Sequence, residues 1–514
     1  MKIASYLILL LTGILIACGG GGGGGSSSSS STSSNYIRSQ VPFATPILAG
    51  TVEPFVSGAT SSTYFVGDSY TAVISGSGQD FITVGFQSCP CVVANHLNSR
   101  INMFSWKNGS LVDVTTQWFP NSTNEILGSY AVKFGDFFRS GRIDMLVVPG
   151  ADKSDLTGPA YLFINNGSSF ARTTIDLGNN INAQDLAIVD VNGDGYLDFI
   201  STDTGQQMTF GINNKSNNFT LYNTKNSNGI ASASGSFLAV GDFLNNGTVT
   251  FVLDGGLNGY QGSTVSRTGL YSWNIDANNK LTFTLISVLP QSRFLLSKWS
   301  SKNFTGVENL GIVSLDINND GKLDVAMFSQ PVKSNDNNYS EVQFMQNDGS
   351  GNFTDVTDTV LVGYNNSSRV SYVPRLFDIN GDGLMDILAS GGDSNGTSTQ
   401  WLLKSSDGKY VATWTGQSTD FLTQTYGLTG GSASSADHSN SLNFIKDASG
   451  QLHLVTYVQF LGSGRRQLRV YTSLLGTPAS GKASQTAVNL STQPWPYLKA
   501  PVNNPSLAAT AQNY

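Results

Sequence analysis

The stretch Asp316-Ile-Asn-Asn-Asp-Gly-Lys-Leu-Asp324 decides the fold of this 514-residue chain, because close copies of it occur at two other places. They are Asp190-Val-Asn-Gly-Asp-Gly-Tyr-Leu-Asp198 and Asp378-Ile-Asn-Gly-Asp-Gly-Leu-Met-Asp386. Each copy has Asp at positions 1, 5 and 9, Asn at position 3 and Gly at position 6, and apolar, strand-like segments flank it. The motif therefore predicts a tight loop between two β-strands.

Four weaker copies of the loop extend the pattern over most of the chain. The copy at 136–144 keeps both terminal Asp residues, and the copy at 242–250 keeps the first Asp, an Asn and the Gly. A shortened copy ends at Asp80, and a fourth runs from Asp447 to His453. Measured at the last loop position, the copies lie 52 to 74 residues apart. This regular spacing predicts seven repeats of one structural unit.

A second signal follows each loop in phase with it. A strand, a tight turn and another strand are predicted at 106–109, 163–170, 210–219, 344–353 and 404–408. Several of these turns contain Asn-Gly or Asp-Gly, which favour hairpins because the turn needs positive φ. Each repeat should thus supply four strands. In the third repeat we expect them near 184–190, 197–202, 208–213 and 218–222.

Four antiparallel strands in about 60 residues cannot bury both faces of their sheet alone. Seven such sheets packed around an axis would bury one another and protect their edges. The sequence therefore predicts an all-β fold, a seven-bladed β-propeller of four-stranded antiparallel blades. Tandem β-sandwiches are the alternative, but their turns would come every 8–12 residues without a phased Asp loop. A composition of 39% hydrophobic and 12% charged residues, with 28 Phe and 19 Tyr, also favours short strands over helices.

These loops and hairpins resemble the FG-GAP or VCBS repeats, a family that includes the propeller of the integrin α-subunit. The resemblance covers residues 36–472. It implies a propeller scaffold with calcium held in blade loops, and the domain is placed at 36–480 with a C-terminal tail at 481–514.

Carboxylates at positions 1, 5 and 9 also point to a metal on chemical grounds. Three acidic groups brought together repel one another unless a cation neutralises them, and oxygen ligands in a flexible loop favour calcium. The side chains at positions 1, 3, 5 and 9 and the backbone carbonyl at position 7 are the expected ligands of about three calcium ions. They are Asp190, Asn192, Asp194, Tyr196 and Asp198; Asp316, Asn318, Asp320, Lys322 and Asp324; and Asp378, Asn380, Asp382, Leu384 and Asp386.

Two alternatives to a calcium loop are an EF-hand and an Asx-rich turn without an ion. An EF-hand needs a bidentate Glu at position 12, where this chain has Ser201, Met327 and Ala389. The strand-like flanks also exclude a helix–loop–helix unit. An Asx-rich turn without an ion is the other interpretation, and it is preferred for the four weaker loops.

The N-terminus predicts an export signal followed by a lipid anchor. Residues 1–17 contain Lys2 and an apolar run too short to span a bilayer, as in a signal peptide. The run ends Leu15-Ile16-Ala17-Cys18, which resembles the bacterial lipobox and makes Cys18 the lipidated residue. Residues 18–35 form a Gly- and Ser-rich tether. By resemblance, Gly19 after the Cys favours a lipoprotein of the outer membrane, in contact with the membrane through its lipid alone. An ordinary signal peptide with a chance Cys is the alternative.

Two further cysteines and the overall charge limit other assignments. Cys89 and Cys91 could close a small disulfide in an oxidising compartment or remain free thiols. The formal net charge of -7 without a Lys/Arg cluster argues against a nucleic-acid partner.

Antiparallel strand order places the Asp loops and the tight hairpins on one rim of the propeller. The longer connections, at 87–100, 255–267, 289–308, 330–338 and 415–440, should then lie on the opposite rim, where variable loops commonly bind ligands. Arg293, Lys298 and Trp299 in one of them are candidate contacts for a sugar or peptide, or else part of a packed blade-to-blade connection. His96 and His438 could share a site on this rim, although two solvated loop histidines are the simpler expectation.

The leading functional prediction is a non-catalytic binding or adhesion module for a glycan or protein at the cell surface. A polysaccharide lyase or glycosidase of propeller form is the first alternative, and a structural outer-membrane assembly lipoprotein is the second. The ring could be closed by an N-terminal strand near 36–47 or by 486–490, and the N-terminal strand is preferred because it removes an open edge.

Overall fold

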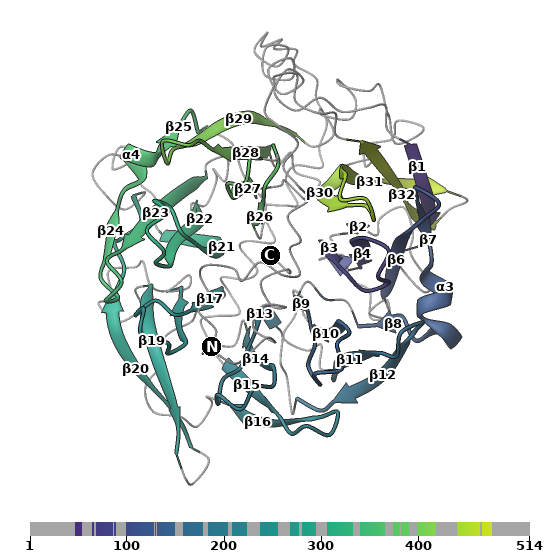
Figure 1. Ribbon diagram of the computed structural model, residues 1–514, viewed down its shortest axis with the longest axis horizontal. Coiled ribbons are helices and arrows are strands. Elements are labelled where there is room, and N and C mark those ends of the chain that lie inside the picture. Colours follow the sequence, from purple (N-terminus) through teal and green to yellow (C-terminus); the bar gives the residue numbers. More distant parts are fainter. Residues whose placement is uncertain are drawn as a thin grey trace.

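In the described residues, the computed structural model contains seven sheets that each include a blade of four antiparallel strands, and a short fifth strand extends two of them. Figure 1 shows the blades arranged around a common axis. The residues it describes are 47–53, 64–65, 68–85, 87–88, 99–127, 129, 131–149, 158–177, 183–203, 208–223, 237–254, 268–276, 280–293, 306–332, 340–364, 374–380, 382–389, 398–417, 439–462 and 465–474. The predicted all-β, seven-bladed propeller is therefore confirmed.

Each blade runs from an inner strand to an outer strand. Blade 1 contains β3 (Asp68–Ala72), β4 (Asp80–Val84), β6 (Ser99–Lys107) and β7 (Ser110–Asp113). Blade 2 contains β9 (Ala131–Gly135), β10 (Asp144–Val148), β11 (Ala160–Asn165) and β12 (Phe170–Ile175). Blade 3 contains β13 (Ala183–Val189), β14 (Asp198–Asp203), β15 (Met208–Asn213) and β16 (Phe219–Asn223). Blade 4 contains β17 (Leu238–Gly241), β18 (Thr250–Leu253), β19 (Gly269–Ile275) and β20 (Leu281–Val288).

The remaining blades follow the same order. Blade 5 contains β21 (Gly306–Leu315), β22 (Asp324–Val332), β23 (Glu341–Asn347) and β24 (Phe353–Asp355). Blade 6 contains β26 (Arg375–Phe377), β27 (Asp386–Ala389), β28 (Ser398–Lys404) and β29 (Tyr410–Gln417), with β25 (Leu361–Val362) parallel to β29 at its edge. Blade 7 contains β30 (Ser439–Lys446), β31 (Leu452–Gly462), β32 (Arg465–Leu474) and β1 (Ile47–Val52).

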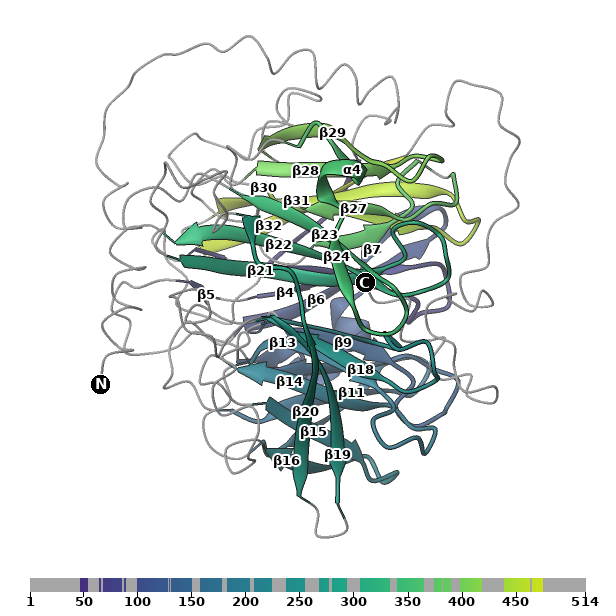
Figure 2. The ribbon, with the colours of Figure 1, turned by 90° about the vertical axis from the view of Figure 1, so that its left-hand side faces the viewer.

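Short elements decorate this frame. The strands β2 (Tyr64–Phe65) and β5 (Gln87–Ser88) pair with each other, and β8 (Glu125–Ile126) pairs with β6. The helices α3 (Thr115–Trp118) and α4 (Thr357–Val360) and the 3-10 turn η2 (Pro120–Ser122) follow outer strands. None of the helices in the described part of the chain is long and apolar enough to cross a membrane. In Figures 1 and 2, β19 and β20 reach outward from blade 4.

The core lies between neighbouring blades. Blades 1 and 2 share a cluster that includes Met103, Phe134 and Phe163, and similar clusters join the next blades around the ring. Between blades 6 and 7, the rings of Phe444 and Trp401 pack edge to face, with 5.5 Å between their centroids. The blades approach so closely that a Cβ on Gly135 of blade 2 would lie 2.6 Å from the Leu197 side chain of blade 3. This apolar burial between sheets stabilises the ring.

An N-terminal strand closes the ring, as preferred from the sequence. β1 pairs antiparallel with β32, and Val52 stands opposite Leu468. The strand occupies Ile47–Val52, so it begins at the last residue of the expected range of 36–47, and residues 36–46 lie outside the described residues. The competing segment, 486–490, lies outside the described residues.

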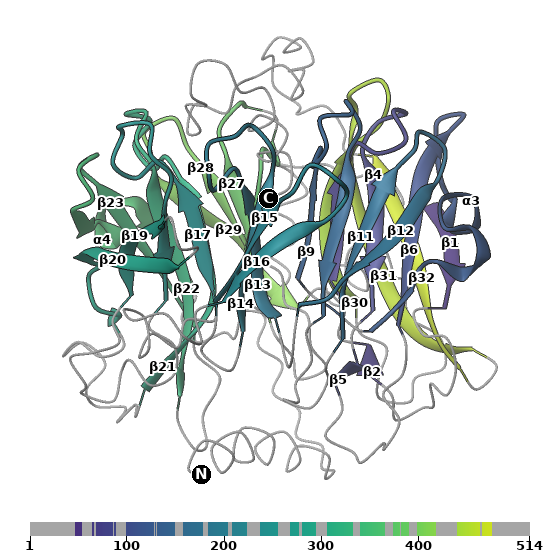
Figure 3. The ribbon, with the colours of Figure 1, turned by 90° about the horizontal axis from the view of Figure 1, so that it is seen from below.

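The two rims differ as the strand order predicts. Figure 3 shows the blades from the side, with the strands running between the rims. Within a blade, the loop between the first two strands lies beside the turn between the last two strands. In blade 5, for example, the backbone amide of Asn347 at the end of β23 donates a hydrogen bond to Asp324 at the start of β22. The connections between the second and third strands, and between blades, leave at the opposite rim.

Candidate metal-binding loops

The Asp at position 1 folds each full loop. In blade 5, the Asp316 carboxylate accepts hydrogen bonds from the backbone amides of Asp320, at 3.1 Å, and Gly321, at 2.8 Å. Positions 4 and 6 are left-handed, with φ of 60° at Asn319 and 81° at Gly321. Asp190 and Asp378 make the same pair of bonds in blades 3 and 6. The predicted need for Gly at position 6 is confirmed.

The Asp at position 9 joins the loop to the sheet. Asp324 is buried and accepts hydrogen bonds from the amides of Ile317, at 2.8 Å, and Asn347, at 2.7 Å. Burial, aided by the charges of Asp316 and Asp320 and opposed by the two amide hydrogen bonds, raises its pKa to about 7. The same causes raise the pKa of Asp198 to about 7 and that of Asp386 well above its ordinary value. The ionised form of each buried carboxylate is therefore disfavoured in the folded loop.

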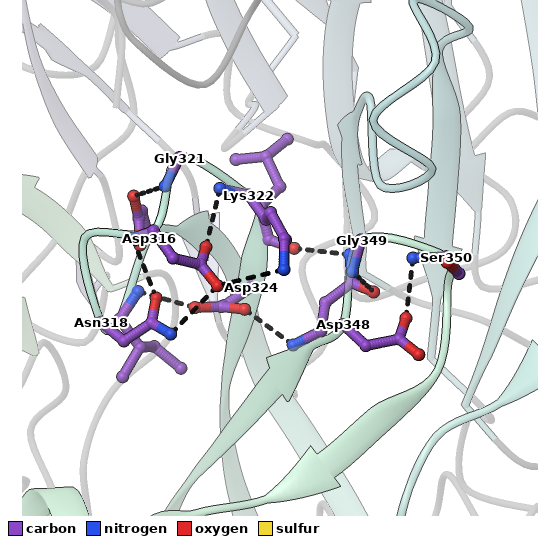
Figure 4. Close-up of polar contacts among 12 residues, drawn as sticks. Asp316, Asn318, Gly321, Lys322, Asp324, Asp348, Gly349 and Ser350 are labelled. Carbon is purple, nitrogen blue, oxygen red and sulfur yellow. Dashed lines mark hydrogen bonds and ion pairs between the residues drawn. The ribbon is translucent and has the colours of Figure 1, made fainter.

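The Asp at position 5 makes hydrogen bonds within the loop; Figure 4 shows the blade 5 loop with Asp316, Asn318 and Lys322 labelled. Asp320 accepts hydrogen bonds from the Lys322 amide, at 3.0 Å, and from the Asn318 side-chain amide, at 3.1 Å. The Lys322 Nζ is 3.4 Å from its Oδ2. In blade 3, Asp194 has the same arrangement, with Lys215 Nζ at 3.3 Å.

Blades 2 and 4 form the same loop without an acidic position 5. Asp136 accepts hydrogen bonds from the amides of Ser140 and Gly141, both at 2.7 Å. Asp242 does the same for Asn246 and Gly247. The side-chain oxygens of Ser140 and Asn246 then accept the amide at position 7, as Asp320 does in blade 5. The loop conformation therefore does not depend on a carboxylate at position 5.

The two remaining weak loops are built differently and meet at the seam between blades 7 and 1. Asp80 accepts hydrogen bonds from Ser75 and Ser105 in place of a second loop Asp. In blade 7, the His453 Nε2 lies 3.0 Å from Asp447 Oδ2, and the Trp106 ring of blade 1 packs on the imidazole at 4.4 Å. These contacts, and not a third carboxylate, complete the two loops.

Among the described residues, no group of three or more His, Cys, Asp and Glu side chains stands arranged to hold a metal ion. The carboxylates of each full loop instead hold backbone amides, while remaining close enough to raise the pKa at position 9. Calcium ligation by these loops stays a prediction.

A set of contacts between blades was not foreseen from the sequence. The last residue of the third strand reaches back to the Asp loop of the preceding blade. Asn213 Nδ2 donates to the Phe137 carbonyl of blade 2 at 2.7 Å, and Asn347 Nδ2 donates to the Phe243 carbonyl of blade 4 at 2.7 Å. Asn165 and Lys404 make the corresponding contacts from blades 2 and 6. We call these four residues the seam residues. Their only sequence signal is their place at the start of each hairpin turn.

The family assignment rests on the same loops. A family profile described as FG-GAP-like repeat matches residues 136–201 and 316–389. These two segments contain the Asp loops of blades 2, 3, 5 and 6, each in a blade of the seven-membered ring. The chain is an FG-GAP β-propeller.

Several solved structures are similar to this FG-GAP propeller at low identity. BBS1N in complex with ARL6DN has 12% identity and a TM-score of 0.41, covering 86% of this chain and 99% of that one. An ancestral GH74 enzyme has 14% identity and a TM-score of 0.43, covering 86% and 52%. The Bacillus licheniformis rhamnogalacturonan lyase PL11 has 12% identity and a TM-score of 0.33, covering 85% of each chain. No curated protein matches the sequence.

Several predicted site residues lie outside the described part of the FG-GAP propeller. They are Cys18, Cys89, Cys91, His96, Lys298, Trp299 and His438.

Arg293 is described, and its guanidinium is already paired. Its Nε lies 3.4 Å from Asp355 Oδ2, and its Nη2 pairs with Asp358. Its backbone amide donates to Glu341 Oε1 at 3.0 Å. These contacts tie Arg293, in the connection after blade 4, to the outer part of blade 5.

Proposed function

We propose that this FG-GAP propeller is a calcium-stabilised binding module that Cys18 anchors by a lipid at the bacterial cell surface, where it engages a glycan or a protein. The observation that carries the calcium part is the redundancy of the position 5 carboxylate. Blades 2 and 4 close the same loop with Ser140 and Asn246.

The extra carboxylate carries an electrostatic cost for the carboxyl at position 9, although against burial the hydrogen bonds from Asn318 and Lys322 lower the pKa of Asp320 itself. Asp194 and Asp320 each stand beside a buried position 9 Asp and contribute to raising its pKa. An acidic group that is unnecessary for folding and unfavourable for its neighbour needs another role. A divalent cation supplies it, because the cation would offset the repulsion among the three carboxylates.

The donor set suits calcium. Each full loop offers three carboxylates, the Asn side-chain oxygen at position 3 and the carbonyl at position 7. All are oxygen ligands on a loop with a left-handed Gly at position 6, and calcium accepts flexible oxygen coordination more readily than magnesium. The bound ion would fix the loop and the start of the second strand.

The binding part of the proposal draws on the rim opposite the Asp loops. The connections 289–305 and 418–438 leave the described strands there, whereas the connections on the Asp-loop rim are shorter. Longer connections on a rigid frame are where propellers and other scaffolds commonly bind ligands. Glycans and cell-envelope proteins fit the location that the lipobox-like sequence predicts.

Calorimetric titration of calcium into the full-length protein tests the metal sites. We expect about three ions to bind, and each of Asp194→Asn, Asp320→Asn and Asp382→Asn to remove one. Asn246→Ala changes the same position in a weak loop and should leave the stoichiometry unchanged. Binding of no calcium by the parent, or equal binding by all variants, would refute the metal sites.

A ligand screen tests the binding function. The full-length protein is applied to glycan arrays and to immobilised envelope proteins, in calcium and in chelator. Saturable binding that weakens in chelator is expected. Turnover of a polysaccharide in place of stable binding would favour the enzyme alternative.

One described cluster favours the lyase or glycosidase alternative. Glu341, at the start of β23 on the opposite rim, is 2% exposed, and its Oε2 has no hydrogen-bond partner in the described part of the chain. Burial raises its pKa to about 7, which suits a general acid, and Arg293 lies between it and Asp355. Because Glu341 is buried and bonded to the Arg293 backbone, a substrate would not reach it directly, and we rank the enzyme second to the binding module. Loss of polysaccharide cleavage in Glu341→Gln, with cleavage retained in Glu53→Gln, would support it.

A further inference from the structure

Lys404 occupies a register position that blades 2, 3 and 5 fill with Asn. It is the last residue of β28, as Asn213 is of β15 and Asn347 is of β23. Its backbone amide donates to the position 9 Asp386 at 2.7 Å, just as those of Asn213 and Asn347 donate to Asp198 and Asp324. The residue at this seam between blades 5 and 6 therefore differs from Asn213 and Asn347 in its side chain and not in its backbone hydrogen bond.

The Lys404 ammonium group is built into the Asp loop of blade 5. The residue is 2% exposed, and Nζ donates to the Asp316 carbonyl at 2.7 Å and to Asn319 Oδ1 at 2.8 Å. Neither acceptor belongs to the proposed calcium ligand set. The ammonium group and a calcium ion could therefore occupy the loop together.

The residue at loop position 4, which accepts a hydrogen bond from Lys404 in blade 5, differs between the loops of blades 3 and 5. Position 4 of the blade 5 loop is Asn319, with φ of 60°, whereas blade 3 has Gly193, with φ of 73°. Glycine is the easier residue for this backbone, but it has no side-chain acceptor. The left-handed Asn319 and the buried Lys404 form one unit that the seam between blades 3 and 4 lacks, where Gly193 and Trp273 stand instead.

We propose that Lys404 is a resident cation that lowers the calcium affinity of the blade 5 loop, so that the loops of blades 3 and 5 bind calcium with different affinities. This inference rests on the proposed calcium function. A buried positive charge at the loop opposes the arrival of a divalent cation through a medium that screens less than water. The ammonium group meanwhile holds blade 6 against the blade 5 loop when calcium is absent.

The Lys404 charge distinguishes the calcium loop of blade 5 from that of blade 3. Each loop has one other lysine at its position 5 Asp, with Lys215 Nζ 3.3 Å from Asp194 and Lys322 Nζ 3.4 Å from Asp320. These two more exposed pairs are alike and largely cancel in the comparison. The residue that reaches each loop from the next blade makes the difference: Trp273 Nε1 of blade 4 donates to the Val191 carbonyl of the blade 3 loop at 3.4 Å, whereas the Lys404 ammonium group contacts the blade 5 loop.

The test measures calcium affinity at the blade 5 loop alone, by calorimetry on the full-length protein carrying Asp194→Asn and Asp382→Asn. In this background, Lys404→Asn should tighten calcium binding by about fivefold, from removing one charge several ångströms from the ion. Lys404→Gln is a second neutral variant, should the first fail to fold. Lys404→Arg keeps the charge and should bind like the background protein.

Lys409→Asn is the matched control, because Lys409 is an exposed lysine of the same blade that pairs with Asp407. It should leave the affinity unchanged. If the background protein binds calcium but the neutral Lys404 variants bind it no more tightly, the role of Lys404 is refuted while the calcium sites stand. If the background protein and the unmodified parent bind no calcium, both proposals fall.

Discussion

The side-chain amide of Asn213 lies 2.7 Å from the carbonyl oxygen of Phe137, although the two residues belong to neighbouring blades. The same amide donates to the Leu197 carbonyl of its own blade at 3.1 Å, and Asn213 Oδ1 accepts the Lys215 amide at 2.8 Å. One buried side chain therefore joins the Asp loops of two blades to a hairpin turn. At four blade boundaries, such hydrogen bonds hold the rim together in addition to apolar packing.

Replacing this side chain should loosen the ring. Asn213→Ala leaves two buried carbonyl oxygens and one amide without their partner, so we expect a loss of about 2 to 4 kcal/mol in the free energy of unfolding. Urea denaturation followed by tryptophan fluorescence measures it. Asn274→Ala changes an exposed residue of β19 and should cost under about 0.5 kcal/mol. Equal midpoints for the two variants would contradict the role of the seam residues.

Closure of the ring by β1 can be tested within that strand. Val52 is 6% exposed and packs with Phe81, Phe104 and Leu468, whereas Ile47 at the other end of β1 is 68% exposed. Val52→Asp buries an unpaired charge and should destabilise the protein by about 3 kcal/mol or more. Ile47→Asp should be nearly neutral. If thermal unfolding shows that both substitutions are tolerated alike, β1 does not close the ring in solution.

The stability of blade 2 should depend on pH through Asp144. Burial raises the pKa of this carboxyl to about 7, with a smaller contribution from the Asp136 charge. The folded state therefore holds the proton more tightly than the unfolded state. The stabilisation from Asp144 is complete below about pH 4 and is lost as the pH rises through about 7, with a slope of at most about 1.4 kcal/mol per pH unit.

Asp144→Asn removes this titration. Urea midpoints of the parent and the variant, taken in chelator from pH 4 to 8, should therefore fall less steeply with pH for the variant. The Asn side chain has one oxygen acceptor fewer than Asp, which lowers the urea midpoint of the variant at every pH. The comparison therefore uses the change in midpoint between pH 4 and pH 8 for each protein. Parallel pH profiles would show that the carboxyl titrates normally in the folded protein.

The repeat pattern predicted the blades well because it is local. Hairpin turns and apolar alternation placed the third strand of the third repeat at 208–213, which is the observed range of β15. Loop boundaries followed from Gly321 and its equivalents, since a left-handed residue in a tight turn is recognisable without knowing its neighbours.

Contacts between blades could not be predicted in the same way. Asn213 and Phe137 are separated by 76 residues, and nothing in either local sequence specifies the other. The parallel strand β25 and the His453 contact with Trp106 likewise depend on how complete blades pack. The position 5 carboxylates were found from the sequence, but only the structure shows that Ser140 and Asn246 can replace them in folding the loop.

The central claim is that the position 5 carboxylates serve calcium. It is tested most directly by the melting temperature of the full-length triple variant Asp194→Asn, Asp320→Asn and Asp382→Asn, with and without calcium. Ion binding at 100 times the dissociation constant stabilises a protein by about 2.7 kcal/mol per site, so the parent should melt several degrees higher in calcium. The triple variant should fold, because Asn246 already fills this position in blade 4, and it should show no rise. An equal rise in the parent and the triple variant, or no rise in the parent, would contradict the account.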